Sequence, residues 1–250
     1  MRYLFQFLCV CALSALPLVG CSETAGAGGG GGSAGGGGTA GDGGANTASV
    51  VFSLYEWDPV QGNVGPAVDV EICDTGTTNC VQTDDIGAAT LEGMPVDQEV
   101  SSTLDKDGLA SYLDSYIVSA TGFVVVHGMA TEQRLTDQFE RMMSPYPMVG
   151  TGMIFVDTGT LVGATFKLVG TDGKAFYRDA DGNFDPDLTA TTAFGGGGFL
   201  EVSSPGEYEV EIGGTADNCV IIRGWSGDSD NTVKLPIQEG YMSTAIVACQ

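Results

Sequence analysis

Short segments in which apolar and polar residues alternate recur along the sequence after about residue 48. Residues 68–72 read VDVEI, residues 164–168 read ATFKL and residues 208–212 read YEVEI. Successive side chains of a β-strand point to opposite faces, so a period of two predicts strands with one buried face. Clusters of Gly, Pro, Asn and Asp separate these segments at the spacing typical of β-sandwiches. The alternation therefore predicts an all-β fold.

One segment, residues 130–143, has helical rather than alternating spacing. Its sequence ATEQRLTDQFERMM carries four apolar residues on one helical face and is followed by two prolines. This pattern predicts a single short amphipathic helix. Its methionines could form a partner-binding surface, but packing into the core is the commoner role. The apolar residues of this face are Leu135, Phe139, Met142 and Met143.

The two halves of the remaining chain contain similar stretches. Residues 85–104 and 193–212 each place a glycine-containing turn, an apolar pair and a polar bend with proline before an alternating strand. A repeat of this length predicts two tandem β-sandwich modules, joined by the helix. We assign residues 48–128 to the first sandwich, 129–152 to the inter-domain helix and linker, and 153–250 to the second.

The N-terminus has the pattern of an export signal. Residues 1–20 contain one charge, Arg2, and then a long apolar stretch, which predicts a secretory signal peptide rather than a lone membrane-spanning helix. The tetrapeptide LVGC at 18–21 resembles a bacterial lipobox. That resemblance implies lipidation of Cys21, with attached acyl chains such as palmitate, after cleavage of the signal. An ordinary cleaved signal and a retained anchor are the alternatives.

The segment after Cys21 predicts a spacer. Half of residues 22–47 are glycine and none is large and apolar, so this glycine-rich linker, residues 21–47, is expected to be a disordered tether. A coil of this length holds the following domain on the order of 30 Å from a bilayer. Ser22 resembles the sorting residue of outer-membrane lipoproteins in Gram-negative bacteria, which implies the outer membrane, facing the periplasm or the surface.

Charge excludes some classes of partner. The sequence carries 32 acidic against 9 basic residues, a net charge of −23. Such a chain repels nucleic acid and anionic lipid, and it has no Gly-rich loop followed by Lys-Ser or Lys-Thr for phosphate. We expect no nucleic-acid partner.

The cysteines predict disulfide bonds. Cys9 and Cys11 lie in the signal and Cys21 is the lipidation candidate, which leaves four for an oxidising compartment. Four cysteines allow three pairings. The division into two sandwiches favours the local pairs Cys73–Cys80 and Cys219–Cys249. A metal site is the alternative, but it lacks paired short spacings and a histidine partner.

Residues 162–212 carry a family resemblance. An apolar strand after GA, a charged hairpin, a glycine-rich run ending in GF and then PGEYEV together resemble a carboxypeptidase regulatory-like, or transthyretin-like, domain. The resemblance implies a seven-stranded Greek-key sandwich that serves as a non-catalytic binding or accessory module. With the internal repeat, it predicts two tandem Greek-key β-sandwiches of Ig-like or transthyretin-like type. The first half matches less well, because Pro95 lacks a following glycine and Glu99 or Val100 replaces the tyrosine.

The stretch DADGNFDPD at 179–187 places oxygen-bearing side chains at alternate positions, which could bind calcium. An EF-hand-type loop needs glycine at its sixth position and glutamate at its twelfth, where this chain has Phe184 and Ala190. A solvated turn is the alternative, since Asp, Gly and Asn are also turn residues. No other cofactor is expected. The calcium candidates are Asp179, Asp181, Asn183, Asp185 and Asp187.

No constellation in the sequence indicates catalysis. His127 is the only histidine, and no Gly-x-Ser-x-Gly elbow follows a predicted strand. We therefore expect His127 to bind a neighbouring group and the protein not to be an enzyme. Several aromatic residues could stack on sugar rings or fill the core. They are Tyr55, Trp57, Tyr177, Phe184 and Trp225.

These features together predict a membrane-anchored lipoprotein that acts as a binding or adhesion module. Its expected partners are the membrane, through the N-terminal lipid, and an extracellular protein or polysaccharide. A structural envelope component that assembles with other membrane proteins is one alternative. An accessory domain of a secreted hydrolase system is another.

Overall fold

Alternating and apolar segments of the chain fold into β-strands in the structure, a computed structural model that describes residues 46–58 and 61–250. The predicted signal, Cys21 and nearly all of the tether lie outside the described residues. The elements are β1 (Thr47–Asp58), β2 (Gly62–Pro66), β3 (Glu71–Asp74), β4 (Cys80–Gln82), β5 (Ala88–Pro95), β6 (Glu99–Asp105), β7 (Tyr112–Ile117), β8 (Phe123–Met129), α1 (Glu132–Arg141), β9 (Thr151–Asp157), β10 (Ala164–Val169), β11 (Lys174–Arg178), β12 (Phe184–Asp185), β13 (Gly197–Ser203), β14 (Gly206–Gly214), β15 (Val220–Arg223), β16 (Trp225–Ser226), β17 (Thr232–Ile237) and β18 (Met242–Ala248).

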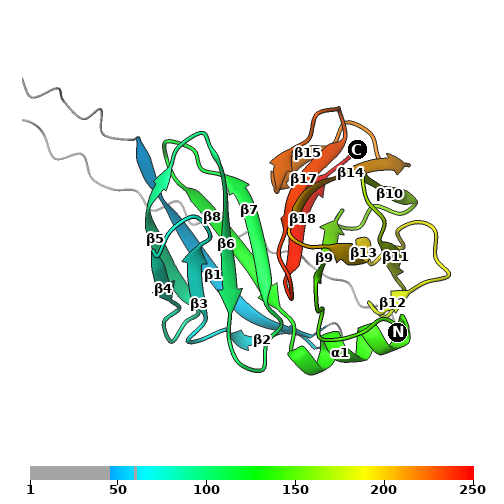
Figure 1. Cartoon of the computed structure of the whole chain (residues 1–250), viewed down its shortest axis with the longest axis horizontal. Coiled ribbons are helices and arrows are strands. Elements are labelled where there is room, and N and C mark those ends of the chain that lie inside the picture. Colours follow the sequence, from blue (N-terminus) through cyan, green and yellow to red (C-terminus); the bar gives the residue numbers. More distant parts are fainter. Residues whose placement is uncertain (1–45, 59–60) are drawn as a thin grey trace, which may run out of the picture. The chain divides into compact units, whose positions relative to one another are not determined.

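The strands form three sheets (Figure 1). The first has the order β2-β1-β5, with β8 paired to β1. The second contains ten strands in the order β12-β11-β13-β9-β18-β7-β6-β3-β4, with β15 paired to β18. The third has the order β10-β14-β17-β16. Most neighbours are antiparallel, but β8 is parallel to β1, and β18 is parallel to both β7 and β9.

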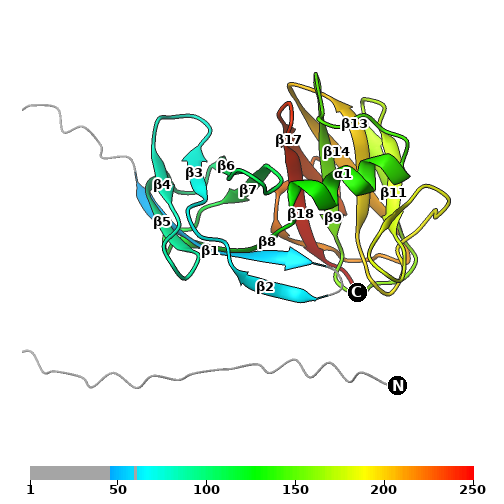
Figure 2. The same ribbon diagram turned by 90° about the horizontal axis from the view of Figure 1, so that it is seen from below.

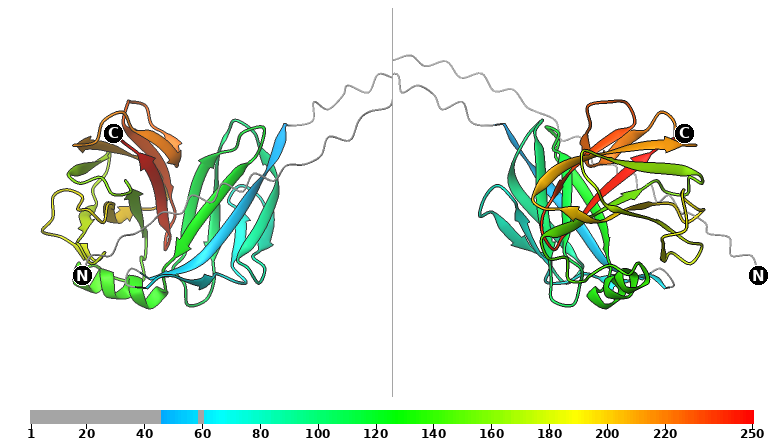
Figure 3. Two further views of the ribbon diagram at one scale, coloured as in Figure 1. Left: turned by 180° about the vertical axis from the view of Figure 1, so that it is seen from behind. Right: turned by 45° about the vertical axis from the view of Figure 1, so that its right-hand side comes forward.

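Two hydrophobic clusters hold these sheets together. In one cluster, Phe52 and Leu91 of the first sheet pack with Leu104 and Tyr116 of the ten-stranded sheet. In the other, side chains of β9, β13 and β18 pack against those of β10, β14 and β17. Each four-stranded sheet therefore covers part of the long sheet, as the views in Figures 2 and 3 show. The predicted all-β sandwich fold with one helix is confirmed.

The long sheet contains strands from both predicted modules. The last strand, β18, lies between β7 of residues 48–128 and β9 of residues 153–250. Backbone hydrogen bonds therefore run without interruption from one half to the other, and the described residues belong to one compact unit. The division at residues 129–152 stays a prediction about domain boundaries.

The internal repeat has a structural counterpart. Residues 85–104 contain β5 and most of β6, and residues 193–212 contain β13 and most of β14. In each repeat the first strand belongs to one sheet and the second to the facing sheet. The second strand also pairs with a strand earlier in its own half of the chain, β6 with β3 and β14 with β10.

The three alternating segments differ in how well they predict strands. Val210 and Ile212 are buried in β14, whereas Glu209 is partly exposed and Glu211 is exposed, as expected. Ala164 and Phe166 are likewise buried in β10. The segment 68–72 is strand only from Glu71, because Asp69 has a φ of 55° in a turn. The Thr83 hydroxyl stabilises this turn, donating to the Ala67 carbonyl and accepting from the Val70 N–H.

Helix α1 is shorter than residues 130–143. The Thr131 hydroxyl accepts the N–H of Arg134 and caps its first turn. Leu135, Phe139 and Met142 are buried as predicted, but Met143 is 83% exposed with a φ of 52°, so its predicted place on the apolar face is wrong. The chain turns there and leaves the helix. No helix within the described ranges is long and apolar enough to cross a membrane.

Both local disulfides are present. Cys73 and Cys80 join paired positions of β3 and β4, and Cys219 and Cys249 join the chain before β15 to the residue after β18. The predicted pairing is confirmed. The second bridge spans 30 positions against 7 for the first, so on the chain-entropy model it removes more freedom from the unfolded chain.

We expect replacement of both Cys219 and Cys249 by alanine to lower the free energy of unfolding by about 3–4 kcal/mol. The matched Cys73→Ala/Cys80→Ala variant should lose only about 2–3 kcal/mol, because its loop is shorter. Urea unfolding of both variants measures the difference. An equal or larger loss from the short loop would contradict this explanation.

Candidate ligand-binding site

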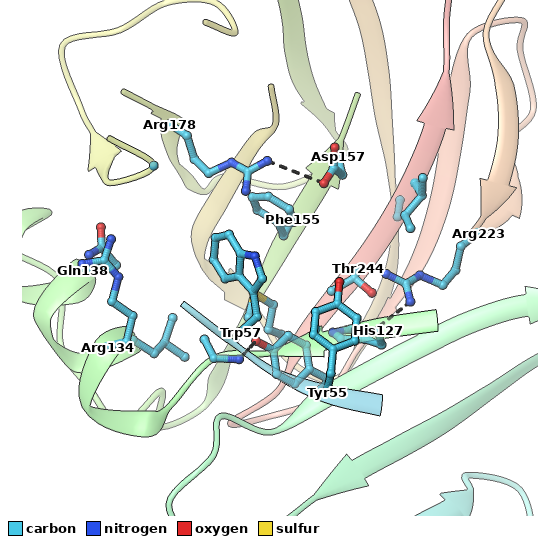
Figure 4. A pocket seen from close by; sticks show the side chains of 18 of the residues that line it. Tyr55, Trp57, His127, Arg134, Gln138, Phe155, Asp157, Arg178, Arg223 and Thr244 are labelled. Carbon is cyan, nitrogen blue, oxygen red and sulfur yellow. Dashed lines mark hydrogen bonds and ion pairs between the residues drawn. The ribbon is translucent and has the colours of Figure 1, made fainter. Parts of the chain in front are cut away.

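A cavity of about 250 Å³ lies where the end of β1, helix α1 and the long sheet meet (Figure 4). Its walls combine aromatic rings with charged and amide side chains. Strands β1 and β8 form one side and α1 another, and residues of β7, β9, β11, β12, β15 and β18 complete the lining. The lining includes Tyr55, Trp57, His127, Arg134, Gln138, Phe155, Asp157, Arg178 and Arg223.

Two half-buried aromatic residues at the end of β1 form part of the wall. Tyr55 and Trp57 follow the buried run of β1, and Trp57 points toward Phe155 and Arg178 in Figure 4. Gly128 of β8 lies directly against them. A Cβ at this position would come within 2.8 Å of the Tyr55 ring and 2.9 Å of the Trp57 Cβ. Glycine is therefore needed for these two side chains to take their places.

Arg178 is held at the wall by a carboxylate, two carbonyls and two rings. Its Nη2 lies 3.5 Å from Asp157 Oδ2, and its Nε donates to the Gly195 carbonyl at 2.8 Å. The guanidinium also lies over the Phe155 ring, 4.7 Å from the centroid. Burial lowers the pKa of Arg178, and Asp157 opposes that effect. The guanidinium thus keeps its charge in a largely desolvated position.

The glycine run at 195–198 makes room for Arg178. Gly196 has a φ of 73°, and a Cβ there would come within 2.8 Å of Arg178 Nη2. Both the left-handed backbone and the close approach require glycine.

At the cavity wall, four side chains form a buried polar network, three of which line the cavity. Asp114 of β7 is fully buried and binds His127 Nδ1 at 2.8 Å and Arg223 Nη1 at 3.1 Å. The hydroxyl of Thr244 donates to the other carboxylate oxygen. The expected contact of His127 with a neighbouring group is therefore present, and the neighbour is a carboxylate. Arg223 and Thr244 come from β15 and β18, so the network joins both halves of the chain.

Burial acts on both titrating members of this network. Burial alone would raise the pKa of Asp114, but Arg223, His127 and Thr244 together lower it to about 2. Burial lowers the pKa of His127 further than Asp114 raises it, and Arg223 lowers it again. His127 is therefore neutral near pH 7, and the paired charges are those of Asp114 and Arg223.

The network does not have the arrangement of a nucleophile, base and orienting acid. Such a triad needs the hydroxyl on the imidazole and the carboxylate on the opposite side of the ring. Here the Thr244 hydroxyl binds Asp114, and the Arg223 Nη1 lies 3.0 Å from His127 Nδ1. The geometry is that of a buried ion pair with additional donors.

Helix α1 contributes two donor groups to the cavity from successive turns. Arg134 Nη2 donates to Asn183 Oδ1 at 2.7 Å, and Gln138 Oε1 accepts the Phe184 N–H at 2.7 Å. Both helix residues line the cavity. The Gln138 side chain is only 3% exposed, and its Nε2 has no partner in the described part of the chain.

The aspartate-rich loop lies beside this helix and uses its oxygens within the turn. Asp179 Oδ1 accepts the backbone N–H groups of Asp181 and Asn183, and its Oδ2 lies 3.7 Å from Arg141. Asp185 accepts the N–H of Asp187. The described residues contain no cluster of three or more His, Cys, Asp or Glu side chains placed to hold a metal. Calcium binding by this loop stays a prediction.

The aromatic candidates divide into two groups. Tyr55, Trp57 and Phe184 line the cavity. Tyr177 and Trp225 are only 4% and 5% exposed and belong to the core, where they bind the Phe166 N–H and the Val100 carbonyl.

Sequence reasoning missed the arginines of the cavity. Three of the four arginines after residue 2 line it, although the chain as a whole is strongly acidic. The available signal was the excess of 32 acidic over 9 basic residues, because a guanidinium is well suited to bidentate pairing with a carboxylate. Gln138 and Asp157 gave no signal in the sequence.

No protein-family model matches the sequence, and no curated protein matches it. Among solved structures, the chain resembles the Bacillus anthracis TIE protein at 17% identity and a TM-score of 0.26, covering 81% of this chain and 34% of that one. It resembles the minor pilin GBS52 of Streptococcus agalactiae at 11% identity and a TM-score of 0.25, covering 81% and 96% of the two chains. For the major pilin protein of Streptococcus pyogenes the identity is 10%, the TM-score 0.21 and the coverage 81% and 95%. These are remote likenesses that indicate no function.

We expect the free energy of unfolding to fall as the pH drops below about 6.5, the ordinary pKa of histidine. The folded-state pKa of His127 is lowered, so the unfolded chain takes up the proton first and acid favours it. The slope should approach at most about 1.4 kcal/mol per pH unit. Because the chain has one histidine, a His127→Gln variant should lose this dependence between pH 7.5 and 5.5 in urea unfolding. The same slope in the variant would contradict the assignment.

Proposed function

We propose that this protein is a lipid-anchored surface or periplasmic lipoprotein whose β-sandwich body binds an extracellular polysaccharide without cleaving it. The observation that carries this proposal is the cavity walled by Tyr55, Trp57 and Phe155. Binding sites for small units are concave, largely apolar and supplied with a few polar groups that fix orientation. Flat aromatic faces beside amide and guanidinium donors suit a sugar ring, which has both apolar faces and hydroxyl acceptors.

The anchor is proposed from the N-terminal sequence. Cys21 would carry the lipid, and the glycine-rich residues after it would act as the spacer. Several acyl chains on one cysteine make attachment stable, since each buried methylene contributes about 0.8 kcal/mol. The resemblance of residues 162–212 to carboxypeptidase regulatory-like domains supports a binding role. A lipid anchor and a binding body together would hold a polysaccharide at the envelope.

We expect Trp57→Ala to weaken polysaccharide binding at least about tenfold, because the indole offers the largest ring in the cavity wall. A tenfold loss corresponds to about 1.4 kcal/mol. The full-length chain in detergent, applied to a glycan array and then titrated with the strongest ligands by calorimetry, gives the reference affinities. Met143→Ala is the control, since Met143 is 83% exposed and does not line the cavity. Absence of any polysaccharide ligand on the array would contradict the proposed function.

We expect Cys21→Ser to prevent lipidation and to release the protein from the membrane fraction. In cells fed an alkyne-labelled fatty acid, the unaltered chain should carry the label and the variant should not. Cys73→Ala/Cys80→Ala is the matched control, because it removes two other cysteines and leaves Cys21 unchanged. Label on the Cys21→Ser variant would show that the proposed anchor is wrong, whatever the body binds.

A further inference from the structure

The donors on helix α1 are not balanced by acceptors. Arg134 and Gln138 are four residues apart, so their side chains lie on the same helix face. Arg141, Arg178 and Arg223 each have a carboxylate within 4 Å, at Asp179, Asp157 and Asp114. Within the part of the chain that the structure describes, Arg134 has no such carboxylate and binds only the neutral oxygen of Asn183 through its side chain.

The second donor is left without any partner. Gln138 is held in one orientation because its Oε1 accepts the Phe184 N–H, which leaves its Nε2 as a free donor. A buried polar group without a hydrogen bond costs about 1–3 kcal/mol. A ligand acceptor in the cavity that Gln138 lines would remove that cost, so the free Nε2 indicates an acceptor-bearing ligand.

The charge of the cavity indicates that the ligand is an anion. Arg178 and Arg223 are compensated by Asp157 and Asp114, whereas the charge of Arg134 has no compensating carboxylate. This excess of positive charge lies in a chain with a net charge of −23. A guanidinium is planar and binds planar carboxylates with good geometry. One uncompensated charge beside one amide donor matches a singly charged carboxylate.

The aromatic residues of the wall and the volume of the cavity indicate which kind of molecule carries the carboxylate. Tyr55 and Trp57 line the cavity, and Gly128 leaves space for their side chains. At about 250 Å³ the cavity lies just below the range of about 300–1,000 Å³ for pockets that enclose drug-sized ligands. It therefore suits one sugar unit rather than a folded peptide segment.

We propose that the cavity selects a carboxylate-bearing sugar, the uronic acid unit of an acidic polysaccharide. Its carboxylate accepts hydrogen bonds from the Arg134 guanidinium and Gln138 Nε2, and its ring lies against Trp57 and Tyr55. This inference rests on the proposed function and narrows it from polysaccharides in general to acidic ones.

The test compares the charged acid form and the neutral ester form of one oligosaccharide. Oligogalacturonides and their methyl esters share one sugar backbone, and esterification removes the negative charge. The detergent-solubilised full-length chain should bind the acid form at least tenfold more tightly by calorimetry, and this preference should shrink as salt is raised. Equal affinity for acid and ester would overturn the inference while leaving polysaccharide binding intact. An acidic peptide of equal charge that bound as tightly would overturn the assignment to a sugar.

Matched variants place the preference on helix α1. Arg134→Gln keeps a donor for Asn183 but removes the charge, and it should lose the preference for the acid form. Arg141→Gln makes the same change about two turns further along the helix, outside the cavity lining, and should keep it. Gln138→Glu keeps the acceptor for the Phe184 N–H but replaces the free donor by a negative charge, and it should bind the acid form more than tenfold more weakly. An unchanged acid-to-ester ratio in Arg134→Gln, with the melting temperature preserved, would overturn the inference.

Discussion

The buried carboxylate of Asp114 is the constraint on which the joining of the two halves depends. An isolated charge at this depth would cost several kcal/mol, and only close partners offset that cost. Its partners come from β8, β15 and β18. Arg223 and Thr244 reach Asp114 from the second half of the chain, so these contacts stabilise the observed placement of β18 beside β7. Removal of either would leave a charge or an acceptor buried without its partner.

The same strands set the position of the cavity. Strand β9 sends Ile154 and Val156 into one hydrophobic cluster, while Met153 and Phe155 face the other side, toward the cluster that includes helix α1. The long sheet is thus covered on both faces in this region. The cavity lies on the helix side, where polar side chains of α1 line it beside the buried apolar ones. The network at Asp114 joins β8 and β18, which both contribute to the cavity lining.

The parts of the fold that follow from sequence are those in which one face of an element meets water. Residues 208–212 alternate because glutamates of β14 are exposed, and the cysteine pairs follow from their position in the two halves. Residues 152–156 show no period because β9 is buried on both faces. The cavity also could not be predicted, since Trp57, Arg134 and Arg178 meet only through tertiary packing. Trp57 and Trp225 are both strand tryptophans, but Trp57 lines the cavity whereas Trp225 is buried in the core.

The bond between Asn183 and Arg134 makes the aspartate-rich loop part of the cavity's support. One amide oxygen positions the guanidinium, and the turn around Asp179 positions that oxygen. A cation bound to this oxygen would lie beside the Arg134 guanidinium, and the two positive charges would repel each other. A cation that coordinated Asn183 would therefore release Arg134 from this oxygen, so the loop and the cavity would compete for a single acceptor.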